Sequence, residues 1–402
     1  MTPRRVAVTG LGAISALGAD VASLWSGVSE GLCGIRPIAS IPTERLTVRT
    51  AAEIRDFDPS AHFETRRLLG LDRAAQLALV AARQAMATAG TEGLPPRRCG
   101  VVLGAALGQH TIDDSYQALY GQAAKRLPPL TVPRIMPSAA ASHVSIEFGL
   151  RGPCFATASA CASATHAIGI AFQMIRAGML DLAVTGGSDA SICVGFMKAW
   201  DALRVLSPDM CRPFSRDRAG LVIGEGAGIL VLESWEHAQA RGAAIHAELV
   251  GFGMSADAAD LTAPNAGGAA QAIGDALEDA GLAPEQVDYV NAHGTGTHLN
   301  DRTETLALAR VFGAYLRRLP VSSSKSMLGH CLNAAGALEL IVTVLALREG
   351  RLPPTIGFRE ADPDCDIDCV PNRMRPAAIE VALSNSFAFG GLNAVLALKR
   401  AA

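Results

Sequence analysis

Aromatic side chains and charges are scarce in this sequence. Only 5% of the residues are aromatic and 18% are charged, and 35 basic against 38 acidic residues leave a net charge of −3 with neither sign gathered into long blocks. Because nothing resembles a basic stripe, we expect neither nucleic acid nor a membrane surface as a partner. No apolar stretch reaches the roughly 18 residues that a membrane-spanning helix needs, so we predict no membrane span.

Paired cysteines, a signal sequence and a nucleotide fingerprint are missing as well. The nine cysteines are scattered, and the nearest pair, Cys365 and Cys369, has no histidine cluster beside it, so we expect no metal site. Scattered cysteines and the lack of a signal pattern favour a reducing compartment, so we expect a cytoplasmic protein. Gly10 and Gly12 do not complete the Gly-x-Gly-x-x-Gly spacing, which argues against a nicotinamide cofactor.

Small and apolar residues are abundant instead. Half of the 402 residues are apolar and 40 are glycine, a composition that favours close packing of backbones in a large core. Segments typical of buried strands alternate with helical stretches such as 74–89 and 269–280, which indicates an α/β fold. Two segments share one pattern, a buried strand that ends in glycines: Arg5–Gly12 and Ala247–Gly253. This repetition suggests an internal duplication. We therefore predict an N-terminal half at residues 1–248 and a C-terminal half at residues 249–402.

Cys161 is the strongest candidate for a reactive group. It lies in a run of small residues, Ala156–Thr165, that leads from an extended segment into a helix. Because the first amides of a helix are unpaired and its dipole is positive there, we expect the pKa of this thiol to be lowered. His293 and His330 follow far downstream, each beside glycine. One cysteine and two histidines in such settings suggest thioester chemistry.

Five separated motifs carry a resemblance to a known family. They are Arg151–Pro153 ahead of Cys161, Arg212–Phe214 with Gly224–Gly228, Asn291–Thr297, Ser324–His330 and Asn385–Gly391. In this order they resemble, over essentially the whole chain, the elongating β-ketoacyl-acyl carrier protein synthases of the thiolase superfamily. Three shorter segments are most similar to the nodulation-protein-E branch of that family: Met136–Ala141, Lys198–Trp200 and Pro363–Asp366. The resemblance implies a thiolase-like α/β fold, with two duplicated halves in five layers, α/β/α/β/α.

The resemblance also implies an acyltransferase that performs a decarboxylative Claisen condensation. Cys161 would take an acyl group from an acyl carrier protein, and His293 and His330 would stabilise the enolate left when malonyl-carrier protein loses carbon dioxide. The backbone N–H groups of Cys161 and Phe389 match the oxyanion donors, and Phe389 also matches a gate to the acyl pocket. The product would be a 3-oxoacyl chain two carbons longer, for fatty acid or specialised acyl or polyketide biosynthesis. No resident cofactor is expected, because phosphopantetheine arrives on the carrier protein.

Other roles are carried over position by position. Lys325 and Glu339 match groups that set the polarity and orientation of the histidines. Thr295 and Thr297 match hydroxyls that bind the phosphopantetheine amides, and loop capping is the alternative role for both. His298 departs from the family pattern, in which proline is common after the second threonine, but this removes no catalytic group.

Substrate and partner preferences rest on fewer residues. Leu107 and Thr131 stand where the housekeeping enzyme has isoleucine and phenylalanine, so we expect an acyl pocket that accepts long or unsaturated chains, and Trp200 would oppose this by filling space. Because carrier proteins are acidic, a basic docking surface is expected. The candidates are Arg66, Arg67, Lys125, Arg126 and Arg204.

Three rival functions stay open on the sequence. A thiolase would act on coenzyme A esters and normally pairs its nucleophile with a second cysteine, and a cysteine hydrolase would leave the second histidine without a role. A chain-length-factor subunit keeps the fold but loses the nucleophile, whereas this chain has Cys161. We expect a homodimer or a heterodimer with a chain-length-factor-like homologue, in which the partner completes the acyl pocket.

Overall fold

Ten strands form one mixed sheet that runs through the molecule. The computed structural model describes residues 3–91, 95–105 and 107–401. From one edge to the other the strands are β10 (Val321–Ser322), β9 (Tyr289–Asn291), β13 (Val381–Ala388), β14 (Leu392–Arg400), β8 (Ala247–Ala256), β1 (Val6–Ser15), β7 (Gly226–Ser234), β6 (Leu182–Asp189), β4 (Cys99–Gly104) and β5 (Cys154–Thr157). The two halves of the sheet join where β1 pairs with β8 in antiparallel direction, with Val6 opposite Leu249.

The two halves have the same strand order. In each half the first strand lies at the join and is followed by the fifth, fourth, second and third strands in chain order. The first, fifth and fourth strands pair antiparallel, and the fourth, second and third pair parallel. This agreement in order and direction matches the expected duplication. The C-terminal half opens with β8, so a division after residue 248 lies just inside that strand.

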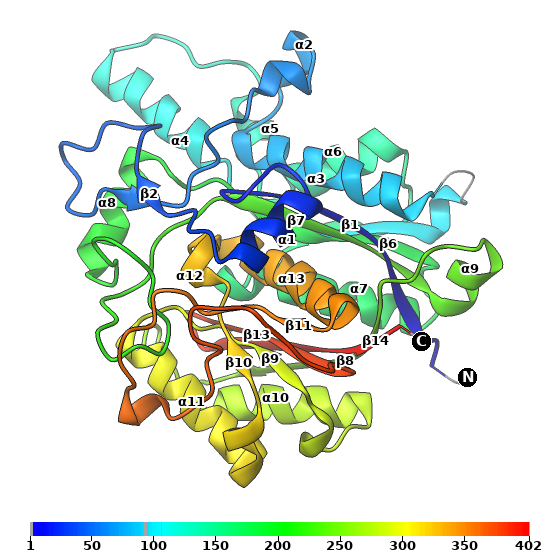
Figure 1. Ribbon diagram of the computed structural model, residues 1–402. Helices are drawn as coiled ribbons and strands as arrows, with labels where there is room; N and C mark the ends of the chain where they lie inside the picture. The colour runs from blue at the N-terminus through cyan, green and yellow to red at the C-terminus, as the bar shows by residue number, and fades with distance from the viewer. Residues whose placement is uncertain (1–2, 92–94, 106, 402) are drawn as a thin grey trace.

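Helices lie outside and between the two halves of the sheet (Figure 1). α3 (Arg73–Ala89) and α6 (Ala139–Phe148) cover the outer face of the N-terminal half, and α10 (Ala266–Ala280) and α11 (His298–Phe312) cover that of the C-terminal half. α7 (Ser163–Arg176) and α13 (Ala335–Glu349) form the middle layer. Every residue of α13 from Ala335 to Leu347 is buried, because this helix is apolar on all sides. The predicted five layers, α/β/α/β/α, are therefore confirmed.

Glycines in the first strand of each half let a helix approach closely. A Cβ atom on Gly12 of β1 would lie 1.9 Å from the carbonyl oxygen of Ala81 in α3, and one on Gly253 of β8 would lie 2.1 Å from that of Ala272 in α10. No side chain fits at such distances. The glycine pattern that opens each half is thus a packing requirement repeated by the duplication, which also accounts for the incomplete nucleotide fingerprint.

Shorter elements complete the fold around this frame. The remaining α-helices are α1 (Val21–Glu30), α2 (Thr65–Leu68), α4 (Gln109–Tyr116), α5 (Thr131–Ile135), α8 (Val194–Leu203), α9 (Trp235–Ala240) and α12 (Lys325–Leu328). Two-residue strands pair as β2 (Arg36–Pro37) with β3 (Thr50–Ala51) and as β11 (Arg351–Leu352) with β12 (Arg375–Pro376). Within the described ranges, no helix has both the length and the apolar character needed to cross a membrane.

Candidate active site

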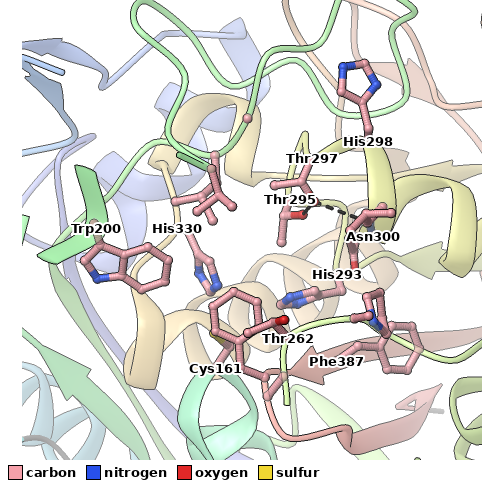
Figure 2. Close-up of a pocket in the computed structure, with 18 of the residues that line it drawn as sticks. Cys161, Trp200, Thr262, His293, Thr295, Thr297, His298, Asn300, His330 and Phe387 are labelled. Carbon is pink, nitrogen blue, oxygen red and sulfur yellow. Dashed lines mark hydrogen bonds between the residues drawn. The ribbon is translucent and has the colours of Figure 1, made fainter. Parts of the chain in front are cut away.

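The candidate site is a cavity of about 250 Å³ lined by residues of both halves. Cys161 comes from the turn before α7, and His293 and His330 follow β9 and α12 of the other half. Figure 2 shows these three side chains around one space, with Trp200 and Phe387 at its sides. The structure therefore brings together the cysteine and the two histidines that the sequence singled out.

A strained turn presents Cys161. Ala160 has a φ of 47°, which is uncommon for a residue with a Cβ atom. The Ser163 hydroxyl supports the turn, since it donates to the Ala160 carbonyl at 2.7 Å, accepts from the amide of Ser159 at 3.0 Å and lies 3.1 Å from the side-chain oxygen of Asn333. These three contacts hold the backbone around Cys161 in place.

The C-terminal half contains a matching turn. Leu332 has a φ of 46°, and the short helical turn Leu332–Ala334 precedes α13 as Ala160–Ala162 precedes α7. Asn333 thus occupies the position that Cys161 has in the other half. The side-chain Nδ2 of Asn333 donates to the Asp189 carboxylate at 2.7 Å. Burial raises the pKa of Asp189 to about 6. Sequence analysis missed this link, although the repeated small-residue turn was visible as a signal.

The Cys161 thiol is protonated at neutral pH. Its burial raises the pKa to about 12, and the nearby ammonium of Lys325 opposes the shift only in part. The lowered pKa expected from the helix start is therefore wrong. The reason is that desolvation of a thiolate in this closed turn outweighs the favourable field of the helix end.

His330 presents an N–H group to the cavity. Its Nδ1 atom accepts a hydrogen bond from the amide of Leu332 at 3.2 Å, so the neutral ring carries its proton on Nε2. Nε2 has no hydrogen-bond partner in the described part of the chain. Burial, reinforced by the charge of Lys325, holds the pKa of His330 well below its ordinary value, so the ring is neutral.

His293 has the same polarity. The Lys325 ammonium lies 3.4 Å from its Nδ1 and donates to its backbone carbonyl at 2.6 Å, which leaves the ring proton on Nε2. Burial and then Lys325 lower the pKa of His293 well below its ordinary value. The two imidazole rings are perpendicular, with centroids 5.4 Å apart. Lys325 is in turn held by a buried ion pair with Glu339 of α13.

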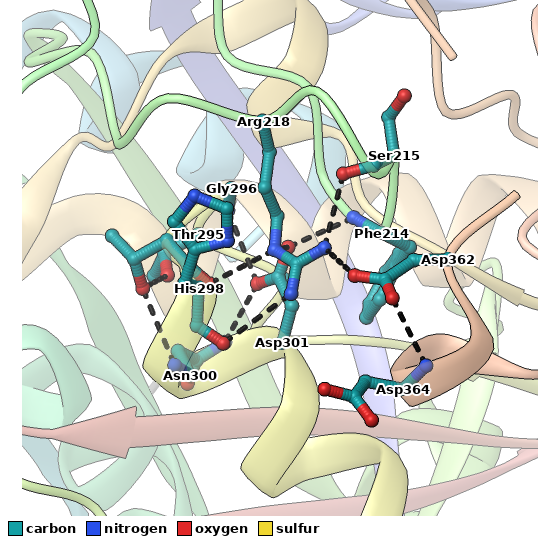
Figure 3. A network of polar contacts seen from close by, with 12 residues as sticks. Phe214, Ser215, Arg218, Thr295, Gly296, His298, Asn300, Asp301, Asp362 and Asp364 are labelled. Atoms are coloured by element: carbon teal, nitrogen blue, oxygen red, sulfur yellow. Dashed lines mark hydrogen bonds and ion pairs between the residues drawn. The ribbon is translucent and has the colours of Figure 1, made fainter. Parts of the chain in front are cut away.

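Two carboxylates of α11 hold the loop that carries His293. Glu304 accepts from the amides of His293 at 2.9 Å and Gly294 at 2.8 Å, and Asp301 accepts from the amide of Gly296 at 3.1 Å. Burial raises the pKa of Glu304 to about 7. Figure 3 shows Asp301 beside Arg218, at 3.6 Å from its Nε. Sequence reasoning missed both acids, although their spacing of three residues at a helix start places them on one face.

Thr295 and Thr297 face the cavity and also build the loop. Their hydroxyl oxygens lie 2.9 Å apart, and that of Thr297 accepts from the amide of Asn300 to cap α11. Both residues line the cavity. The two roles considered for these threonines, capping and substrate contact, are therefore compatible for Thr297.

The rings of Trp200 and Phe389 stack on each other in the lining of the cavity. Their ring centroids are 6.0 Å apart at an interplanar angle of 22°. Phe389 lies in the three-residue turn between β13 and β14, where Gly390 and Gly391 have φ values of 83° and 65°. Such values favour glycine, so the turn depends on the two glycines that follow the aromatic ring.

The other predicted substrate residues lie outside this cavity. Leu107 is 45% exposed and Thr131 is the first residue of α5, and neither lines the cavity of the single chain. Of the predicted docking residues, Arg204 lines it. The others lie on or near α2 and α5, away from the cavity lining: Arg66, Arg67, Lys125 and Arg126. Arg67 is engaged in an ion pair with Glu147.

Comparison with known proteins gives a consistent picture. The family model for the β-ketoacyl synthase N-terminal domain matches residues 3–238, and that for the C-terminal domain matches residues 246–359. Nodulation protein E of Rhizobium sp. (strain N33) is 49% identical over 400 residues, which is 99% of each chain. The 3-oxoacyl-(acyl-carrier-protein) synthase 2 of Staphylococcus aureus (strain N315) is 41% identical over 407 residues, which is 99% of this chain and 98% of that one.

Solved structures agree with the sequence comparison. The ishigamide ketosynthase/chain length factor superposes with a TM-score of 0.96 at 40% identity and with full coverage of both chains. A type II polyketide ketosynthase in complex with its acyl-carrier protein superposes with a TM-score of 0.92 at 31% identity, covering 99% of this chain and 100% of that one.

Proposed function

The chain belongs to the β-ketoacyl synthase family and has a thiolase-like fold, and we propose that it condenses a Cys161-bound acyl chain with malonyl-acyl carrier protein. It is a 3-oxoacyl-carrier protein synthase, an acyltransferase similar along its length to nodulation protein E and to the staphylococcal synthase. Carbon dioxide is released, and the product is a 3-oxoacyl chain two carbons longer.

One observation carries this proposal. His293 and His330 are both neutral, both have Nδ1 engaged, and both direct Nε2–H toward the cavity that holds Cys161. Two convergent donors suit an oxygen that gains negative charge, as the malonyl thioester oxygen does when carbon dioxide leaves. Neither Nε2 can accept a thiol proton in this state, which argues against a cysteine hydrolase that needs a histidine base.

The first half-reaction transfers the acyl group. The Cys161 sulfur attacks the thioester carbonyl, the bond from that carbon to the carrier sulfur breaks, and the thiol proton leaves with the carrier thiol, so no net proton is released. The N–H groups of Cys161 and Phe389 stabilise the oxyanion. Removing one donor of this kind typically costs about 10²–10³ in rate. No resident cofactor takes part, because the carrier protein brings the phosphopantetheine arm.

The second half-reaction forms the carbon–carbon bond. Malonyl-carrier protein loses carbon dioxide while His293 and His330 hold the enolate oxygen, and the carbanion attacks the Cys161 thioester. That thioester bond breaks, the electron pair leaves with the Cys161 sulfur, and the thiolate takes up one proton from solvent to return the thiol, so each condensation consumes one proton. Burial keeps both rings neutral, the positive charge of Lys325 reinforces this, and Lys325 also orients His293. A thiolase would need a second cysteine at the site, and among the described lining residues only Cys161 is a cysteine.

A second subunit covers one face of this chain in our proposal. Exposed apolar side chains gather on α4, α5 and the segment between them, including Tyr120 at 83% and Val132 at 66% exposure. Leu107 and Thr131 belong to the same region. β5 is an edge strand, which among the described strands pairs with β4 on one side only. A homodimer or a heterodimer with a chain-length-factor-like homologue would bury this face and bring these residues to an acyl pocket. Sedimentation of the purified chain separates the two cases.

Intact mass tests the activity directly. Incubation with acyl-carrier protein should add the acyl mass to wild type and not to Cys161→Ala, and malonyl-carrier protein should then release carbon dioxide and a product two carbons longer. An acyl adduct without extension would indicate a transferase or hydrolase. No adduct with any chain length would favour a subunit that only shapes a partner's cavity.

The nine cysteines are all free, which supports our assignment of the chain to the cytoplasm.

A further inference from the structure

Two solvent-exposed side chains that line the cavity have no part in the chemistry above. Arg204 and His298 both line the cavity and both are exposed. Figure 2 shows His298 at the end opposite Cys161. Arg204 is the one charged side chain among the described lining residues, and no carboxylate accompanies it there. The one charge in the described cavity lining is therefore positive, and it is carried by an exposed side chain.

Arg204 occupies a position where glycine would be expected. Six α-helices end in a left-handed cap residue, and five of these residues are glycine. The sixth is Arg204, with a φ of 54° at the end of α8. A side chain is disfavoured in this conformation, so an arginine here carries a conformational cost that glycine would avoid. Within the described ranges its guanidinium forms no ion pair or hydrogen bond that could offset the cost.

The backbone of His298 forms hydrogen bonds with its surroundings, whereas its imidazole ring forms none among the described residues. It is the first residue of α11, directly after Thr297, and its carbonyl accepts from Arg218 at 3.4 Å. The nearby carboxylate of Asp362 is paired with Arg218, as Figure 3 shows, so it is already engaged by another cation. The imidazole forms no hydrogen bond in the described part of the chain. It is thus available to a ligand at the mouth of the cavity.

We propose that Arg204 and His298 bind the phosphate of the phosphopantetheine arm. This inference rests on the proposed function, which places the arm's thioester at Cys161 and its amides at the threonine loop. The phosphate is the one anionic group of the arm and lies at its outer end. On the carrier protein this phosphate is a diester with two free oxygens. A guanidinium can donate to both of them, and an imidazole N–H can donate to one of the same oxygens. Arg204 would then contact the arm itself rather than the acidic surface of the carrier protein.

Three thioesters of the same acyl chain separate the possibilities. They are acyl-pantetheine, which lacks the phosphate, acyl-4′-phosphopantetheine, and the acyl-carrier protein. All three carry the same acyl group, chosen as the one that acylates wild-type Cys161 fastest. The readout is the rate of acyl transfer to Cys161 by intact mass, expressed as the ratio of kcat/KM for phosphopantetheine to that for pantetheine. Arg204→Gly suits the left-handed cap, and His298→Pro suits the first position of a helix, so both variants should fold.

We expect each variant to lower this ratio about tenfold, the effect of one charge-assisted hydrogen bond. Arg302→Ala removes an exposed arginine of α11 that does not line the cavity and should leave the ratio as in wild type. An unchanged ratio in Arg204→Gly and His298→Pro overturns the inference. So does a loss confined to the carrier protein, which would mean surface docking, or an equal loss on all three substrates, which would mean a structural role. Failure of every thioester to acylate wild-type Cys161 would instead refute the proposed function.

Discussion

Alkylation of Cys161 should accelerate about tenfold with each pH unit from pH 6.5 to 9.5. Burial raises the pKa of this thiol from an ordinary 9.0 to about 12. This increase in pKa corresponds to about 4 kcal/mol of additional free energy for forming the thiolate, with burial as the largest contribution. At pH 8, four units below the pKa, roughly one molecule in 10⁴ carries the thiolate. Over this range the thiolate fraction, and with it the alkylation rate, grows in proportion to hydroxide concentration.

The assay follows iodoacetamide labelling over time at each pH. Samples are quenched and digested, and the peptide that contains Cys161 is quantified by mass spectrometry, with Cys161→Ala identifying its signal. The slope of log rate against pH is the diagnostic quantity, because limited access to the cavity lowers every rate by the same factor and leaves the slope at one. Cys154 is exposed and provides an internal thiol in the same sample.

A bend in the pH profile would refute this reasoning. If the rate reached a plateau with a midpoint below about pH 9, the field at the start of α7 would outweigh burial, as the sequence suggested. The resting enzyme would then hold a thiolate. A slope of one throughout means that the nucleophile is generated only when a thioester occupies the cavity and accepts the proton on its leaving sulfur.

Three further predictions test the site and the frame. His293→Ala and His330→Ala should keep acylation of Cys161 but slow carbon dioxide release by about 10²–10³, measured with labelled malonyl-carrier protein; equal loss of both half-reactions would contradict the donor role. Gly12→Ala places a Cβ atom 1.9 Å from a helix carbonyl oxygen, so it should lower the free energy of unfolding, measured in urea, by more than about 2 kcal/mol. As a control, the Cβ atom of Gly274→Ala in α10 meets nothing within 4 Å, so this variant should raise the free energy of unfolding by up to about 1 kcal/mol. Burial raises the pKa of Asp189 in the folded state from 3.8 to about 6, so the folded state binds a proton more tightly than the unfolded chain does. As pH rises from about 4 to 6, the free energy of unfolding of wild type should therefore fall by up to about 3 kcal/mol relative to that of Asp189→Asn. A difference between the two proteins that does not change with pH would show that Asp189 titrates normally.

The contact between the two equivalent turns, one from each half of the fold, explains why the cavity needs both halves. Cys161 and Asn333 sit in equivalent strained turns, and the Asn333 side chain reaches across to the Ser163 hydroxyl that supports the cysteine turn. The duplicated fold has thus placed Cys161 in one copy and the amide of Asn333 at the equivalent position of the other. The histidines come from loops of the second copy, so neither half contains the complete site.

Patterns within the chain sufficed to predict the α/β architecture and to single out Cys161, His293 and His330 as candidates. Five separated motifs that resemble the β-ketoacyl synthases carried that prediction, because each of the three residues taken alone has an ordinary structural alternative. The paired strand openings indicated the duplication because Gly12 and Gly253 meet the same steric demand in each half. Such signals are local: they depend on what the chain can do within a few residues, and they survive without knowledge of distant contacts.

The electrostatics of the site and its supporting contacts depend on packing between segments that are far apart in the sequence. The helix start predicted a lowered pKa for Cys161, but desolvation depends on everything that packs around the thiol, and burial reverses the sign. The proton positions of His293 and His330 follow from Lys325 and the amide of Leu332, which lie near them through the folding of separate elements. Leu107 and Thr131 lie outside the cavity for the same reason, since a pocket wall is made by whichever segments the fold brings together.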